Sequence, residues 1–196
     1  MILESALILS LANQCQSNIS TDIIQKLISI ESSGNPYAIA VKGVPIVKQP
    51  TTKEEAIQSA KQLQQLGFNF SVGLMQVNHT NFDRTELTIE TAFNYCENIK
   101  AGSQIFKDCL DRATIKYPNK NESALLEHAA SCYYSGNFTY GFKKEGKSNV
   151  SYVEKFNGIT SNANQPKKPV KQKTENKTSQ DSNNTAVWDV FGDFSY

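Results

Sequence analysis

Apolar residues recur at three- and four-residue intervals in several separate stretches of the chain, as they do in amphipathic helices. This periodicity predicts helices at about residues 1–15, 20–31, 52–66, 98–114, 122–134 and 149–157. Residues 68–77 instead alternate between apolar and polar or small side chains, which predicts a short extended segment. Residues 37–50 contain glycine and proline and are expected to be irregular. The pattern therefore predicts a mainly α-helical domain.

Residues at the ends of these stretches support the helix boundaries. Ser20 is the expected N-cap of the second helix, with Ile19 and Ile24 as a hydrophobic staple across its first turn. Thr52 and Glu55 fit a capping box at the start of the third helix. Glycine follows the second and third helices closely, as is typical where a helix stops.

The composition changes after the last predicted helix. Residues 158–185 contain almost no large apolar side chains, so they cannot bury enough surface to offset the entropy lost on ordering, and we expect a disordered linker. Residues 186–196 form a short aromatic and acidic end that contains Trp188, Phe191 and Phe194. Aromatic residues on a flexible tether are typical of a docking peptide. The alternative is that this end folds back onto its own domain.

Length and charge exclude some classes of protein. The 196 residues suit one domain with extensions, and the net charge of +1 argues against a nucleic-acid-binding protein, which usually has a clear basic excess. No apolar run approaches the roughly 20 residues that a membrane-spanning helix needs. The first predicted helix carries Glu4 and lacks the basic start of a signal peptide. Either an export sequence is missing from this chain or this helix is itself the export signal.

The cysteines are even in number: Cys15, Cys96, Cys109 and Cys132. They are compatible with two disulfides in an oxidising compartment, or with free thiols in a reducing one. Cys96 and Cys109 flank one predicted helix and would lie about 20 Å apart, too far to be bonded. Cys15 is therefore expected to pair with Cys96 or Cys109. A zinc site is not expected, because the chain has no Cys-x-x-Cys pair and its two histidines lie in unrelated contexts.

Glu31 is the first candidate for chemistry. It follows an apolar helical stretch and is followed at once by Ser-Ser-Gly-Asn-Pro, so it should leave a core-facing helix where the backbone turns. Such surroundings raise the pKa of a carboxyl group and leave an acid that can donate a proton near neutral pH. A glutamate near a helix end is, however, most often a solvated surface residue.

Motifs in separate parts of the chain resemble those of one family. They are Glu-Ser-Ser-Gly-Asn-Pro-Tyr-Ala-Ile at 31–39, Gly-Leu-Met-Gln-Val-Asn at 73–78, Cys-Tyr-Tyr-Ser-Gly-Asn at 132–137 and Ser-Tyr-Val-Glu-Lys-Phe at 151–156. In this order they resemble the lysozyme-like lytic transglycosylases, whose soluble-lytic-transglycosylase fold is related to goose-type lysozyme. The resemblance covers about residues 1–157 and implies an α+β, lysozyme-like helical domain with a small extended segment beside the active-site groove.

Further features resemble one branch of this family, the transglycosylases of type IV secretion and conjugation systems. The segment from Ala38 to Val44, the capped helix at 52–66 and residues 67–73 look like an insert of that branch, and the tail ending in Trp-Asp-Val-Phe-Gly is similar too. The resemblance implies an enzyme in the periplasm or cell envelope that opens the wall locally for such an apparatus. Its expected partners are peptidoglycan glycan strands and other proteins of the apparatus.

The resemblance assigns the sole catalytic carboxylate to Glu31. It implies that Glu31 protonates the β-1,4 glycosidic oxygen between N-acetylmuramic acid and N-acetylglucosamine, and then acts as a base on the muramic O6 hydroxyl, which closes a 1,6-anhydro ring. Because the attack is intramolecular, the second carboxylate of an ordinary glycosidase is not required. No cofactor and no metal are implied. The substrate-binding residues implied are Ser32, Met75, Gln76, Asn78, Tyr133 and Tyr152.

The resemblance also implies individual roles. Ser32 would bind the substrate or orient the carboxyl group, and Tyr152 would extend its hydroxyl towards that group. Gln76 and the backbone around Met75 would form a groove wall for the acetamido groups of the sugars. The chain departs from the family at Tyr134, where many relatives have Asn, so a substrate hydrogen bond from that Asn cannot be carried over.

Two other functions fit parts of the sequence. A hydrolytic goose-type lysozyme or chitinase would need a second carboxylate opposite Glu31, for which Asp83 is a loose candidate. A non-catalytic wall-binding or assembly module would instead act through the linker and the aromatic C-terminal end.

Overall fold

The computed structural model describes residues 2–15, 18–44, 46, 48–146 and 148–159. Its α-helices are α1 (Ser5–Gln14), α2 (Thr21–Ser32), α3 (Lys53–Gln65), α4 (Phe82–Thr85), α5 (Tyr95–Lys116), α6 (Glu122–Ser135) and α7 (Tyr152–Phe156). Short 3-10 turns lie at His79–Asn81 and Tyr140–Phe142. The strands are β1 (Ile39–Val41), β2 (Phe70–Val72), β3 (Val77–Asn78), β4 (Lys144–Glu145) and β5 (Val150–Ser151).

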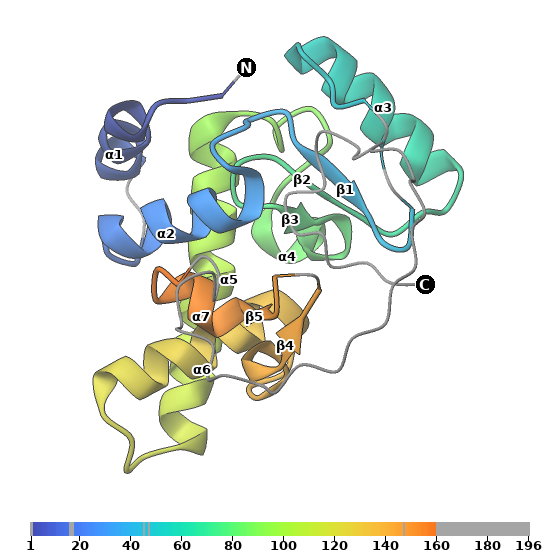
Figure 1. Ribbon diagram of the computed structural model, residues 1–196. Helices are drawn as coiled ribbons and strands as arrows, with labels where there is room; N and C mark the ends of the chain where they lie inside the picture. Colours follow the sequence, from blue (N-terminus) through green and yellow to red (C-terminus); the bar gives the residue numbers. More distant parts are fainter. Residues whose placement is uncertain (1, 16–17, 45, 47, 147, 160–196) are drawn as a thin grey trace, which may run out of the picture.

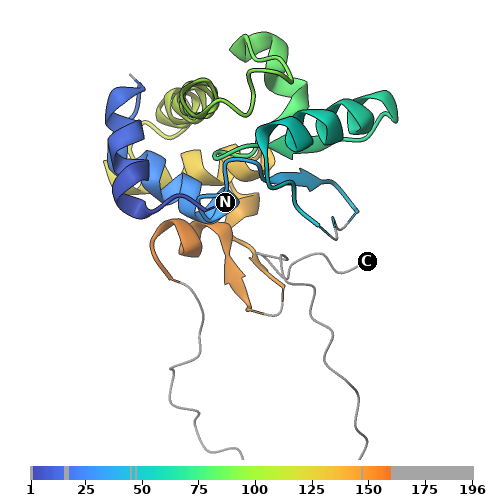
Figure 2. The same cartoon turned by 90° about the horizontal axis from the view of Figure 1, so that it is seen from above.

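The helices surround α5, which runs through the middle of the domain (Figure 1). Helices α1 and α2 lie on one side of α5, and α6 follows it through a turn and packs back against it. Strands β1, β2 and β3 form a small antiparallel sheet on another side, with α3 beside it (Figure 2). The mainly α-helical, lysozyme-like class predicted from the sequence is thus confirmed.

The core joins the helices to the small sheet. Its largest fully buried side chains are Phe70, Phe93, Phe106, Ile24, Leu27, Ile28, Ile39, Leu74, Met75, Ile99, Val72 and Val77. Residues of α2, α5 and the sheet belong to one hydrophobic core, so burial of these apolar surfaces ties the sheet to the helices. The segments that contain the predicted motifs therefore belong to one packed unit.

The sheet contains a strand that the sequence did not predict. Residues 37–50 were expected to be irregular, but Ile39 to Val41 pair with β2 in the register Ile39–Val72 and Val41–Phe70. The side-chain amide of Gln49 completes the other edge, because it both accepts from the Ile39 amide and donates to the Ile39 carbonyl at 2.8 Å. A strand this short has too few residues to show alternation in the sequence.

Other local predictions are partly right. Thr52 caps α3 by accepting a hydrogen bond from the Glu55 amide at 3.2 Å, whereas Ser20 occupies the N-cap position of α2 without a side-chain cap bond. The helix predicted at 149–157 begins only at Tyr152, because Ser151 forms a full capping box with Glu154 and the residues before it pair as β5. The short helix α4 was not predicted.

The cysteines form two disulfides, Cys15–Cys96 and Cys109–Cys132. The first ties α1 to the start of α5, and the second ties α5 to α6. The expectation of two disulfides is confirmed, and Cys96 is the partner of Cys15.

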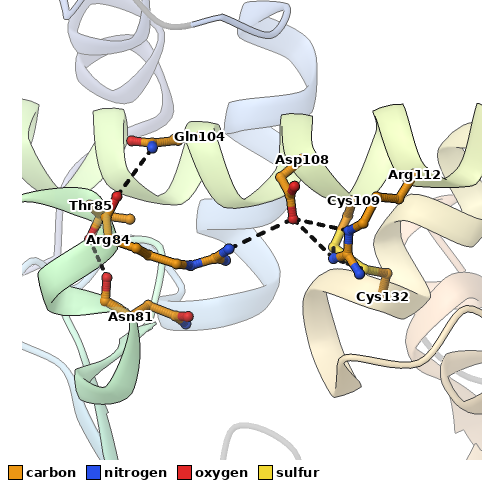
Figure 3. A network of polar contacts seen from close by, with 8 residues as sticks. All are labelled: Asn81, Arg84, Thr85, Gln104, Asp108, Cys109, Arg112 and Cys132. Carbon is orange, nitrogen blue, oxygen red and sulfur yellow. Dashed lines mark hydrogen bonds and ion pairs between the residues drawn. A yellow bond between two sulfur atoms is a disulfide. The ribbon is translucent and has the colours of Figure 1, made fainter.

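A polar network surrounds the second disulfide (Figure 3). The guanidinium of Arg112 lies 3.2 Å from the sulfur of Cys132 and 3.4 Å from that of Cys109. It also pairs with Asp108 at 3.0 Å, and Asp108 faces Arg84 of α4 at 3.7 Å. Because these charged groups are about half exposed, the network contributes modestly to stability and mainly fixes α4 against α5.

The predicted linker from residue 160 onwards and the whole predicted docking segment lie outside the described residues. Among the described helices, none is long and apolar enough to cross a membrane.

Candidate active site

Glu31 lies at the end of α2, where the helix stops. The apolar side of α2, formed by Ile24, Leu27 and Ile28, is fully buried. Ser33 and Gly34 then take left-handed backbone conformations, with φ of 51° and 80°. A side chain at Gly34 would meet the carbonyl oxygen of Leu3 at 2.9 Å, so this turn requires glycine. The sharp turn directs the last helical residues towards the rest of the site.

The carboxyl group of Glu31 is sheltered but not closed off. The residue has intermediate exposure, and the hydroxyl of Tyr152 on α7 donates to Glu31 Oε1 at 2.5 Å. Burial raises the pKa of Glu31 from its ordinary 4.5 to about 7, although the Tyr152 hydrogen bond and the positive charge of Lys155 pull it down. Glu31 thus holds a proton near neutral pH, as the sequence predicted.

Ser32 joins the helix of Glu31 to the second motif. Its side chain is buried, and its hydroxyl points at the carbonyl oxygens of Leu74 at 2.8 Å and Ile28 at 3.2 Å. The hydroxyl is therefore engaged inside the protein and holds Glu31 at a fixed place beside the turn at 73–76. Direct binding of substrate by Ser32 stays a prediction.

The second motif forms a tight turn between β2 and β3. Gln76 has a φ of 46°, a left-handed conformation that is costly for a residue with a side chain. Its side-chain amide offsets this cost by donating to the carbonyls of Ala38 at 3.1 Å and Gly73 at 3.0 Å. Gly73, with φ of 81°, also donates its backbone N–H to Ala38 at 2.8 Å. The turn is held in one shape by these bonds.

The side chain of Met75 is completely buried. Its side chain packs against Gly102 of α5, where an added Cβ would come within 2.7 Å of the Met75 Sδ. Its backbone instead faces other parts of the site, since the Tyr133 hydroxyl donates to the Met75 carbonyl at 2.6 Å. A sugar contact at Met75 stays a prediction.

Asn98 is a residue of this site that sequence reasoning missed. It is buried on α5 and accepts from the Met75 amide at 2.8 Å, while its amide donates to the carbonyls of Val72 at 3.0 Å and Ala92 at 2.9 Å. A Cβ at Gly73 would lie 2.3 Å from the Asn98 amide nitrogen. In the sequence, Asn98 appears only as a polar residue at the start of an apolar helix face. That pattern does not reveal which backbone groups its side chain binds.

Asn78 lies farther along the sheet, at the end of β3. Its amide nitrogen donates to Asn69 at 2.6 Å and Ser71 at 3.2 Å, and its oxygen caps the following turn by accepting from the Thr80 amide at 3.1 Å. Asn78 thus shapes the sheet edge, and its contact with substrate stays a prediction.

The structure brings together residues from α2, the β2–β3 turn, α6 and α7. Glu31 contacts Tyr152, Ser32 contacts Leu74, and Tyr133 contacts Met75. Burial, followed by the nearby Glu31 charge, raises the pKa of Tyr133 well above its ordinary value, so Tyr133 remains a neutral donor. Four motifs that lie far apart in the sequence therefore form one site around a single acid.

Residues 8–156 match the family model described as the Transglycosylase SLT domain. The chain belongs to the Transglycosylase SLT domain family. This family match spans most of the described residues and includes every predicted site residue.

Proteins similar to this SLT domain chain occur in type IV secretion. The chain is 42% identical over 162 residues to "Type IV secretion system protein virB1" of Brucella abortus and of Brucella suis, an overlap of 83% of this chain and 66% of theirs. It is 26% identical over 131 residues to "Protein virB1" of Agrobacterium tumefaciens, covering 67% of this chain and 54% of that one. The matched part is thus slightly under two thirds of the length of the Brucella relatives and about half of that of the Agrobacterium relative. No solved structure matches the chain significantly.

Asp83, the candidate second carboxylate, lines a separate cavity of the SLT domain. Asp83 lies on α4 and lines a cavity of about 600 Å³ together with Lys61, His79 and Glu90, and Glu31 is not among the residues that line it. The groups that act on the Glu31 pKa are Tyr152 and Lys155, neither of them a carboxylate. Neither the cavity nor the pKa of Glu31 thus supports Asp83 as the second carboxylate that the hydrolytic alternative needs.

Proposed function

We propose that this chain is a peptidoglycan lytic transglycosylase that cleaves the β-1,4 bond between N-acetylmuramic acid and N-acetylglucosamine. The observation that carries the proposal is the single sheltered carboxyl of Glu31, with a pKa raised to about 7 and the Tyr152 hydroxyl bonded to it. Membership of the SLT domain family supports the same chemistry. Ser32, Met75, Gln76, Asn78, Tyr133 and Tyr152 are the proposed substrate-binding residues.

The reaction needs one group to act twice. Protonated Glu31 gives its proton to the glycosidic oxygen, the bond from the muramic anomeric carbon to that oxygen breaks, and N-acetylglucosamine leaves with a free hydroxyl. The carboxylate then removes the proton of the muramic O6 hydroxyl as this oxygen bonds to the anomeric carbon. The 2-acetamido group can help stabilise the positive carbon between the two steps. Glu31 ends protonated, and no water is consumed.

A pKa near 7 suits both halves of this cycle. A much lower pKa would leave Glu31 without its proton, and a much higher one would weaken it as the base in the second step. The Tyr152 hydroxyl favours the carboxylate form, so it should assist the moment at which Glu31 has lost its proton.

We further propose that the enzyme acts in the periplasm and opens the wall for a type IV secretion or conjugation apparatus. The similarity to proteins named "Type IV secretion system protein virB1" supports this setting, and the two disulfides fit an oxidising compartment. Incubation with purified cell walls tests the enzymatic part, since the chain should release soluble muropeptides. Binding to walls without any release would favour the non-catalytic assembly module instead.

The rate of wall cleavage should fall above about pH 7. Glu31 must carry a proton to start the reaction, and the fraction that does so falls about tenfold for each pH unit above its pKa. Tyr152→Phe removes a bond that lowers the pKa of Glu31, so it should move this decline to higher pH while reducing the maximum rate. A pH profile of kcat/KM for the wild type and for Tyr152→Phe measures this shift. A decline that moves to lower pH in Tyr152→Phe would contradict the assignment of Glu31 as the acid.

The C-terminal end is proposed to dock onto another protein of the apparatus through Trp188, Phe191 and Phe194. Trp188→Ala combined with Phe191→Ala should weaken association with the apparatus by about tenfold or more, since aromatic anchors dominate such contacts, and should leave wall cleavage unchanged. Co-purification measures the association, with Asn183→Ala combined with Asn184→Ala as the matched control. Unchanged recruitment of the aromatic variant would refute the docking proposal.

A further inference from the structure

Tyr134 stands where the family resemblance leads one to expect Asn, and it lies against Tyr152. The rings of Tyr134 and Tyr152 stack with centroids 4.5 Å apart and planes inclined by 11°. Tyr152 is 5% exposed, whereas Tyr134 is 41% exposed. Tyr134 thus covers one side of the ring whose hydroxyl contacts Glu31, and its own ring also lies near that of Tyr140, with centroids 6.4 Å apart.

The hydroxyl of Tyr134 is fixed as well. It donates to Glu145 Oε2 on β4 at 2.8 Å, and Glu145 also faces the hydroxyl of Tyr140, which raises the pKa of Tyr140. A ring held at its hydroxyl end and stacked along its face has little freedom to tilt. Tyr134 is therefore a rigid support for whatever packs on it.

The strand that receives this hydrogen bond belongs to the hairpin that leads into α7. Glu145 pairs with Val150 in the register of β4 and β5, and β5 ends at Ser151, directly before Tyr152. The ion pair of Lys144 with Glu154 at 3.3 Å joins the same strand to the first turn of α7. Tyr134 consequently holds Tyr152 in two ways, by stacking on its ring and by anchoring the hairpin that precedes it.

We propose that Tyr134 is a positioning residue, which holds the ring of Tyr152 so that its hydroxyl stays on the Glu31 carboxylate during the reaction. This inference rests on the proposed function. Tyr134 acts through Tyr152, so its effect should disappear when the Tyr152 hydroxyl is absent. An aromatic pair contributes enough energy to change a rate by up to about tenfold.

The charged and titratable groups that face Glu31 determine its pKa, which a pH measurement would report. Tyr152 and Lys155 approach from α7, and both lower the Glu31 pKa. Tyr133 approaches from α6. A variant at position 134 that keeps apolar cover but loses the flat ring should weaken the contribution of Tyr152 alone, so the Glu31 pKa should rise.

Tyr134→Leu is the variant that separates these effects, and Tyr134→Phe is the conservative control that keeps the stacked ring. Tyr134→Leu should lower kcat by about tenfold and move the pH decline upward, in the same direction as Tyr152→Phe. Tyr134→Phe should recover most of the rate and the wild-type profile. In a Tyr152→Phe background, Tyr134→Leu should cost less than about twofold, because interacting residues are not additive.

Two results would overturn the proposal. One is a full tenfold loss from Tyr134→Leu in the Tyr152→Phe background, and the other is a change in KM alone, which would make Tyr134 a sugar contact. The Glu31 pKa can also be followed by carboxyl 13C NMR without any turnover. An unchanged Glu31 pKa in folded Tyr134→Leu would therefore refute the positioning role even if the proposed function failed, whereas inactivity of the wild type would refute only the proposed function.

Discussion

Glu31→Gln should reduce wall cleavage by about 10³-fold or more. The amide has the shape of the carboxyl group but can neither donate a proton to the glycosidic oxygen nor take one from the O6 hydroxyl, and proton transfer of this kind contributes about 10²–10⁴-fold. Glu31 makes both proton transfers in the proposed reaction, so the variant loses both at once. Release of soluble muropeptides from purified walls measures the effect.

The loss of activity should not come with a loss of stability. Burial raises the folded-state pKa of Glu31 above its unfolded value, so the folded protein binds the proton more tightly, and stability falls as the pH rises from about 4.5 through about 7. Glutamine avoids the cost of an ionised buried carboxylate. Glu31→Gln should therefore be at least as stable as the wild type, with an advantage that grows over this pH range in thermal melts.

Glu54→Gln is the matched control for this variant. Glu54 is exposed in the first turn of α3, away from the acid, and its change to an amide should leave cleavage as it is. Full activity of Glu31→Gln would mean that another group supplies the proton. If Glu31→Gln is inactive on walls but the secretion apparatus still works fully with it, then the assembly role matters more than cleavage.

Asn98→Ala should cost about 3 kcal/mol or more in the free energy of unfolding. The substitution removes three buried hydrogen bonds, those to the amide of Met75 and to the carbonyls of Val72 and Ala92. Each contributes about 0.5–1.5 kcal/mol, and more where the backbone group is left without a partner. For a chain of this size the melting temperature should fall by roughly 10 °C. Cleavage should fall as well, because Asn98 holds the backbone of Met75, whose carbonyl accepts the hydrogen bond from the Tyr133 hydroxyl.

Asn94→Ala provides the comparison on the same helix. Asn94 caps α5 by accepting from the Cys96 amide at 3.1 Å, and loss of an N-cap costs about 1 kcal/mol. Asn98→Asp keeps the acceptor for the Met75 amide but loses both donors, so its effect separates the two kinds of bond. If Asn98→Ala were no more destabilising than Asn94→Ala, the role given to Asn98 would be wrong.

The sequence was sufficient for the described α-helices other than α4 and for the sheltered position of Glu31. Helical periodicity is a local property, and the apolar side of the stretch before Glu31 is clear because Ile24, Leu27 and Ile28 recur at helical spacing. The sheltering of Glu31 followed from its place at the end of that helix. The motif resemblance added Tyr152, whose hydroxyl the structure places on the Glu31 carboxyl.

The remaining features depend on contacts between distant residues. β1 forms because Gln49 and β2 complete its hydrogen bonds, and Met75 turns inward because Gly102 leaves room for it. Tyr134 could be read from the sequence only as a departure from the family, because its partner Tyr152 lies far along the chain. Long-range packing of this kind leaves no periodic signal.

The most direct test of the account is the chemical identity of the sugar end that cleavage produces. Purified peptidoglycan digested with the chain, and with Glu31→Gln in parallel, is treated with borohydride and examined by mass spectrometry. Attack by the muramic O6 hydroxyl gives 1,6-anhydro ends, which are one water lighter than hydrolytic ends and resist reduction. The account predicts anhydro ends that depend on Glu31, and reducible muramic ends would contradict it.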